Sequence, residues 1–230
     1  MVFHSVICTF AVKTELKRIG NRMKKRVYLL VVILLVILQG HAQTTPAVTV
    51  YREFKPATIH LVDGRLLKVS LANIFLKNSS LLYKSGIDTK EANLKTLTRV
   101  DFEDRSYFKI DSLLAYQVDT IGNDALYCAQ KIDYEAWRQM VTNNSVLSSL
   151  DLGDMIGYTY ADLADEQDLH FPIMTLYYFK LDGKFVLAHE RHLKRVLNKE
   201  KKRLMEAVMS DKAFSWTDEK SLIKLLRIIQ

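Results

Sequence analysis

Residues 58–71, TIHLVDGRLLKVSL, hold the pattern that decides the fold class. Two apolar-rich arms flank Asp63 and Gly64, and an Asp-Gly pair favours a tight hairpin because glycine accepts a positive φ without a Cβ penalty. In the second arm, apolar and polar residues alternate over residues 67–71, which predicts a strand with one apolar face and one polar face. The stretch therefore predicts two antiparallel strands joined by a turn.

The same order of strands and turns continues along the chain. Turn residues at 78–79, at 104 and at 122–123 separate further apolar and β-branched runs, so that a turn recurs about every eight to twelve residues. This spacing is typical of compact antiparallel structure. We therefore predict a β-rich domain over residues 43–132, built as an antiparallel β-sheet or small barrel.

Residues 133–230 read as a second, α+β region with a helical tail. DYEAWRQMV has helix-compatible residues with Asp133 as the cap. A polar, turn-rich stretch over residues 142–154 and the following residues 155–168, which have no clear period, mark a boundary or a long loop. Asp182 and Gly183 then centre another hairpin. The predicted fold class is α+β, an antiparallel sheet or small barrel followed by a hairpin and C-terminal helices.

The last helix of the tail carries an apolar stripe. Its apolar residues follow the i, i+3, i+4, i+7 spacing of one helix face: Leu222, Leu225, Leu226 and Ile229. Ser215 or Thr217 is the expected N-cap. Such a stripe packs a short helix on a sheet or on another helix.

Residues 23–43, MKKRVYLLVVILLVILQGHAQ, have the three parts of a secretory signal peptide. The uncharged run is too short for a membrane span, which needs roughly 20 apolar residues. We expect residues 23–42 to be a signal peptide cut before Gln43, and residues 1–22 to be an extension from a start codon assigned too early. The alternatives are a long n-region and an uncut signal anchor.

Net charge argues against nucleic-acid binding. The chain carries +7, but residues 1–42 hold seven basic residues and one acidic residue, which leaves +1 from Gln43 onward. Within that part, residues 43–179 carry −5 and residues 180–230 carry +6. We expect the basic tail to present solvated lysines and to lie against the acidic body. The alternative is a docking surface for an anionic partner such as a lipid head group.

Two histidine and carboxylate motifs invite a chemical interpretation. HERH places His189 and His192 on one helix face, but the zinc-protease signature needs one more residue between its histidines. We interpret both as solvent-facing side chains at a strand-to-helix junction. A second cluster, in which a solvated loop is favoured over a calcium or acid–base site, contains Asp162, Asp165, Glu166, Asp168 and His170, with Asp151 and Asp154 before it.

The sequence shows no familiar motif of a catalytic nucleophile or of a phosphate-binding loop. It has no Gly-x-Ser-x-Gly motif and no glycine-rich phosphate loop. Cys128 lies in the apolar stretch LYCAQ, which favours a small buried hydrophobe over a nucleophile. Aromatic residues are expected to line the sheet core rather than to stack on a sugar or peptide: Tyr107, Phe108, Tyr116, Tyr127, Tyr158, Tyr160, Tyr177, Tyr178 and Phe179.

Three stretches of the chain resemble uncharacterised exported proteins of Gram-negative anaerobes. They are FLKNSSLLYKSG, TRVDFEDRSYFKID and the tail from LDGKFVLAHERH to the end. The resemblance implies a cell-envelope setting and carries no activity. We expect a periplasmic or extracellular, non-enzymatic binding module, with no cofactor, no metal, no nucleic acid and no assigned catalytic residue. Its partner is an envelope protein or ligand, and it meets the membrane only if the signal is retained. The alternatives are an extracytoplasmic hydrolase using Asp162, Asp165 or His170, and a signal-anchored membrane protein.

Overall fold

A computed structural model describes residues 44–45, 48–143, 159–160, 163 and 170–230. Contacts divide the chain into one unit of Met1–Ala42 and a second of Gln43–Gln230. All described residues belong to the second unit. The predicted loop or boundary over residues 142–168 lies mostly outside the described residues.

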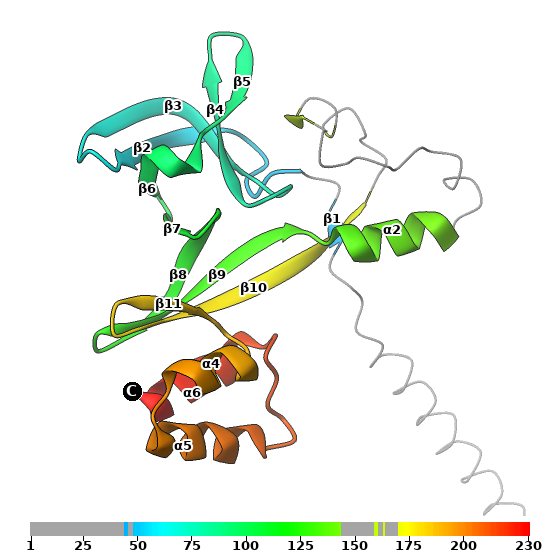
Figure 1. Cartoon of the computed structure of the whole chain (residues 1–230). Helices are drawn as coiled ribbons and strands as arrows, with labels where there is room; N and C mark the ends of the chain where they lie inside the picture. Colours follow the sequence, from blue (N-terminus) through cyan, green and yellow to red (C-terminus); the bar gives the residue numbers. More distant parts are fainter. Residues whose placement is uncertain (1–43, 46–47, 144–158, 161–162, 164–169) are drawn as a thin grey trace, which may run out of the picture. The chain divides into compact units, whose positions relative to one another are not determined.

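The described strands of this unit pair into one antiparallel sheet (Figure 1). The strand order is β1-β10-β9-β8-β7-β6-β2-β3-β4-β5, and β11 also pairs with β10. The strands are β1 (Thr44–Thr45), β2 (Lys55–Leu61), β3 (Leu66–Phe75), β4 (Ser80–Ser85), β5 (Asp88–Glu91), β6 (Leu97–Phe102), β7 (Ser106–Ile110), β8 (Leu113–Ile121), β9 (Asp124–Ile132), β10 (Phe171–Leu181) and β11 (Lys184–Leu187). Together with the helices below, this confirms the broad α+β class.

The turns lie where the sequence places them. β2 and β3 pair antiparallel around Asp63 and Gly64, with His60 opposite Leu66. β8 and β9 join where Ile121 pairs with Asp124. At the β10–β11 turn both central residues have positive φ, 48° at Asp182 and 79° at Gly183. That geometry matches the right-handed twist of the paired strands.

The expected apolar face of β3 is confirmed for Val69, which packs half-buried against the core, and is wrong for the two leucines beside it. Leu67 is 48% exposed and Leu71 is 41% exposed. The register of β2 against β3 shifts between Lys55 and Ala57, and β4 pairs with β3 only from Ala72 onward. The part of β3 before Ala72 therefore lies at the margin of the core, where Val69 packs but the leucines reach solvent.

Strands β2–β4 and β6–β8 surround a common core, although β4 and β8 are not neighbours in the sheet order. Ser79, just before β4, links the two. Its hydroxyl donates to the Leu114 carbonyl at 2.7 Å, and the Leu114 N–H donates to the Ser79 carbonyl at 2.8 Å. The core is filled by buried side chains, among them Ile59, Ile74, Leu81, Leu97, Val100, Tyr107 and Leu114.

Helices complete the fold. They are α2 (Tyr134–Asn143), α4 (Glu190–Val196), α5 (Lys199–Met209) and α6 (Glu219–Ile229), with a short 3-10 turn η1 (Leu94–Thr96). Asp133 caps α2 as predicted, because its carboxylate accepts the Ala136 N–H at 3.0 Å. α4, α5 and α6 gather beside β8, β9 and β10 (Figure 1) and share one buried cluster with them. No described helix is long and apolar enough to cross a membrane.

The predicted apolar stripe of α6 is confirmed, but its predicted cap is wrong. Leu222, Leu225, Leu226 and Ile229 are fully buried. The N-cap is Asp218, whose carboxylate accepts the Ser221 N–H at 2.8 Å. Ser215 and Thr217 instead bond each other through their hydroxyls at 2.9 Å. The helix therefore starts later than the sequence pattern indicates.

Substituting Asp218→Ala should lower the free energy of unfolding by about 1 kcal/mol, the usual cost of losing an N-cap carboxylate. Thr217→Ala is the matched control and should change it by less than about 0.5 kcal/mol, as for an ordinary surface substitution. Urea unfolding monitored by circular dichroism measures both. An equal loss of unfolding free energy in the two variants would mean that the Asp218 carboxylate does not stabilise the start of α6.

Candidate functional site

The acidic residues singled out in the sequence are not brought together in the described part of the chain. Those at positions 151, 154, 162, 165, 166 and 168 lie outside the described residues. His170 is described and exposed, next to the start of β10. Both the favoured solvated loop and the alternative acid–base site therefore stay predictions.

The HERH motif has a structural role at the start of α4. Nδ1 of His189 accepts the Arg191 N–H at 3.3 Å, so this histidine caps the helix. Its ring also stacks on Trp216, with ring centroids 6.1 Å apart. His189 is exposed and His192 is half-buried. Among the described residues, no group of three or more His, Cys, Asp or Glu side chains is placed to hold a metal ion.

Cys128 is a buried hydrophobe, as predicted. It is 1% exposed and lies on β9 between Tyr116 of β8 and Tyr177 of β10. Burial raises the pKa of the Cys128 thiol, which keeps it protonated and poorly nucleophilic. The aromatic residues expected in the core are also buried or half-buried wherever they are described.

A groove beside the free edge of β8, where β7 ends, is the first candidate site. This edge groove has a volume of about 600 Å3. Its lining consists of Arg99, Asp104, Arg105, Ser106, Phe108, Tyr116, Gln117, Val118 and Glu219. The β6–β7 turn supplies two of these side chains, and the first turn of α6 supplies Glu219.

The short length of β7 creates the edge groove. β7 pairs with β8 only as far as Tyr107 opposite Tyr116. Beyond Tyr116, β8 continues to Ile121 and pairs with β9 alone. The space beside this part of β8 holds the side chains of the β6–β7 turn instead of another strand.

Arg105 is the principal cation of the edge groove. Its guanidinium lies over the Tyr116 ring, 4.0 Å from the centroid, and no ion pair to a carboxylate is present for it among the described residues. Burial opposes its charge, but the hydroxyls of Tyr107, Tyr116 and Tyr51 outweigh this and raise the pKa of Arg105. This cation–π contact favours a position of the guanidinium over the ring face.

Protonated phenols surround this arginine. Burial raises the pKa of Tyr51, Tyr107 and Tyr116, so all three carry their proton at neutral pH. The Tyr51 hydroxyl donates to Asp104 at 3.2 Å. The Tyr107 side chain is 2% exposed, and its hydroxyl makes no hydrogen bond with the described residues. These three phenols add no negative charge around Arg105; the carboxylates of the groove lining are Asp104, which accepts the Tyr51 hydroxyl, and Glu219.

A polar cluster on β2, β6 and β7 adjoins the groove and holds its second arginine. His60 Nε2 lies 2.6 Å from Asp101 Oδ2, and Arg99 Nε donates to Asp101 Oδ1. Arg99 also donates to Ser106 Oγ at 3.2 Å and lies over the Phe108 ring. Burial opposes the ionised form of Asp101, but hydrogen bonds from Ser106, Arg99 and His60 lower its pKa. The ionised carboxylate thus fixes Arg99.

This cluster does not have the geometry of a nucleophilic triad. In such a triad the histidine stands between the carboxylate and the hydroxyl. Here the His60 ring contacts Asp101, and the Ser106 hydroxyl accepts from Arg99 rather than facing the histidine. The described geometry suits the positioning of cations rather than the activation of Ser106.

Sequence reasoning missed both the edge groove and the polar cluster. TRVDF places Arg99 and Asp101 two residues apart, which puts them on one face of a strand. That spacing was a signal for part of the polar cluster. The third side chain, His60, joins it only because β2 pairs with β6 and places His60 opposite Arg99. Comparison with protein-family models, with curated proteins and with solved structures gave no match.

Proposed function

We propose that the protein is an exported cell-envelope binding protein, without catalytic activity, whose ligand site is the edge groove. The observation that carries the proposal is Arg105, held over Tyr116 in a groove where no described carboxylate pairs with it. An unpaired, oriented guanidinium suits a planar anion because it offers parallel donors to two oxygens. The ligand class is therefore a carboxylate-bearing molecule of the envelope.

The rest of the edge groove supports binding rather than chemistry. Gln117 is exposed, and Val118 gives the groove an apolar side. Arg99 is already paired with Asp101, so we assign it to shaping the groove and Arg105 to gripping the ligand. We further propose that β2–β4 and β6–β8 act as a small barrel that supports the groove, because Ser79 links β4 to β8.

Replacing Arg105→Gln should weaken the binding of a carboxylate ligand by about 10- to 100-fold, the loss expected for a charged hydrogen-bond pair. Nuclear magnetic resonance titration with uronic-acid oligosaccharides and with short peptides bearing a free carboxyl terminus measures the affinity. Arg65→Gln is the control, because Arg65 is exposed at the β2–β3 turn and already pairs with Asp63. Equal affinities for wild type and Arg105→Gln, or no binding of either ligand class, would refute the assignment.

Export is tested separately by the mass of the protein recovered from the producing cells. A chain that begins at Gln43 supports a cleaved signal peptide. A chain that retains Met23 and sediments with membranes supports the signal-anchored alternative. An intact chain in the cytoplasm rules out both.

A further inference from the structure

A second hollow, here called the tail groove, lies between the β10–β11 turn and the connection from α4 to α5. Its volume is about 520 Å3. Apolar side chains form part of its lining, namely Leu181, Val186, Val196 and Leu197. Its polar lining consists of Asp182, Lys184, Arg195, Asn198 and Lys201. Three cations therefore face a single carboxylate.

The walls of the tail groove are held in place by the fold. Leu181 and Leu197 are buried in the cluster between the sheet and the helices. The Asp182 N–H donates to the Asp124 carboxylate at 3.1 Å, which ties the β10–β11 turn to the β8–β9 turn. Asn198 caps α5 by accepting the Lys201 N–H at 2.8 Å. The cations thus project from three anchored segments rather than from a loose tail.

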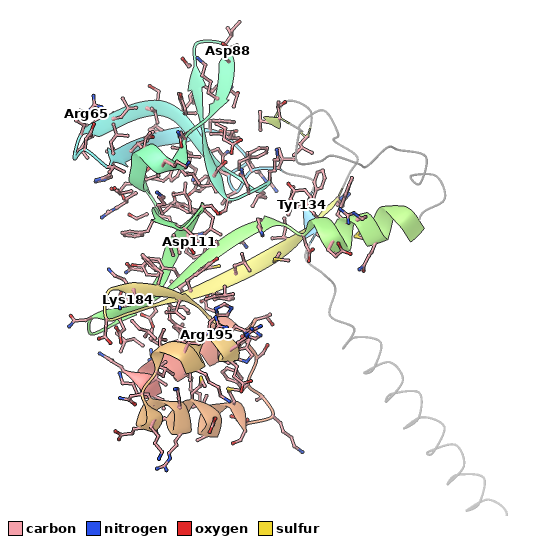
Figure 2. All side chains as sticks on the ribbon, in the orientation of Figure 1. Arg65, Asp88, Asp111, Tyr134, Lys184 and Arg195 are labelled. Carbon is pink, nitrogen blue, oxygen red and sulfur yellow. The ribbon has the colours of Figure 1, made fainter. Side chains whose placement is uncertain are left out.

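The cations of the tail groove have no carboxylate partners in the described part of the chain. Lys184, Arg195 and Lys201 form no ion pair there. Their neighbour Lys194 differs, because its ammonium lies 2.7 Å from Glu190 and 3.1 Å from Glu206. Lys184 beside the β10–β11 turn and Arg195 on α4 are labelled in Figure 2. Mutual repulsion among unpaired cations is unfavourable unless an anion binds between them.

We propose that the tail groove binds a phosphate-bearing anion, gripped by Lys184, Arg195 and Lys201. An arginine offers paired donors to phosphate oxygens, while each lysine adds a point charge. A phosphate with two negative charges offsets the three cations better than a single carboxylate does. This site accounts for part of the excess positive charge of residues 180–230. It is independent of the ligand proposed for the edge groove.

The test is a calorimetric titration of the full-length protein with pyrophosphate at low salt. We expect one saturable site, and we expect Lys201→Gln and Arg195→Gln each to weaken binding about tenfold or more. Both variants should unfold at the wild-type temperature or above it, because each removes a repelling charge. A variant that loses binding but keeps its stability has lost a ligand contact, whereas a variant that loses both has lost a structural contact.

Matched controls use the same charge change outside the groove. Lys199 and Lys202 lie on α5 within two residues of Lys201 but do not line the tail groove. Lys199→Gln and Lys202→Gln should change the affinity less than about twofold, through long-range charge alone. Arg105→Gln should leave pyrophosphate affinity unchanged, so failure of the edge-groove proposal stays distinguishable from failure of this one.

The source of the phosphate is decided by a second arm with vesicles. Sedimentation with phosphatidylglycerol vesicles, absent with phosphatidylcholine and lost in Lys201→Gln, identifies a lipid head group. Pyrophosphate binding without vesicle binding identifies a soluble phosphate ester. The proposal is overturned if neither probe binds, or if Lys199→Gln weakens binding as much as Lys201→Gln, since only total charge would then matter.

Discussion

Replacing Phe179→Ala is expected to lower the free energy of unfolding by about 3–5 kcal/mol. Phe179 is fully buried on β10, between Leu126 of β9 and Val186 of β11. It belongs to the cluster through which the sheet contacts α4, α5 and α6. Removing the ring leaves a cavity where sheet and helices meet, and such a loss is a large share of a typical domain's 5–15 kcal/mol.

Phe185→Ala is the control for this experiment. Phe185 lies on β11 and is 37% exposed, although its ring meets Tyr127 edge-on at 5.2 Å. Its loss should cost about 1 kcal/mol, the worth of one aromatic pair beyond its buried area. Urea unfolding with linear extrapolation measures both variants. Similar losses at the two positions would show that the C-terminal helices do not depend on β10 for their stability.

Local patterns predicted the turns and the helix stripe because short-range chemistry decides both. Asp63 with Gly64 and Asp182 with Gly183 form turns through their own backbone preferences, whatever packs around them. The α6 stripe follows from the helical period alone. In contrast, whether the apolar face of β3 is covered depends on where β4 stops pairing. That is a long-range property, and no window of sequence contains it.

The edge groove could not be predicted from the sequence for the same reason. Arg105 precedes β7, Tyr116 lies on β8, and Glu219 begins α6. Their meeting depends on the early end of β7 and on the docking of α6 beside β8. The charge of the tail could be read from the sequence. However, Lys194 forms ion pairs and Lys201 does not, and this difference depends on which carboxylates the folded helices place beside each lysine.

Asn73→Ala is expected to lower the free energy of unfolding by about 2–4 kcal/mol, because it removes the partner of one buried and two half-buried backbone groups. Asn73 is fully buried. Its amide nitrogen donates to the Tyr51 carbonyl at 2.8 Å, while its oxygen accepts the N–H groups of Tyr51 at 3.1 Å and Ile74 at 2.8 Å. The side chain therefore fixes the segment before β2 against β3. Asn78→Ala is the control, since that exposed side chain only donates to Glu91 and accepts the Ser80 N–H at 3.2 Å, and it should cost about 1 kcal/mol or less.

The same substitution also tests how the core supports the edge groove. Tyr51, held by Asn73, donates its hydroxyl to Asp104 of the groove lining. Asn73→Ala should therefore speed amide hydrogen exchange at Tyr51 and weaken ligand binding at Arg105, while pyrophosphate binding stays as in wild type. Unchanged exchange at Tyr51 would mean that this segment is held by other contacts, and the groove would then owe its shape to the β6–β7 turn alone.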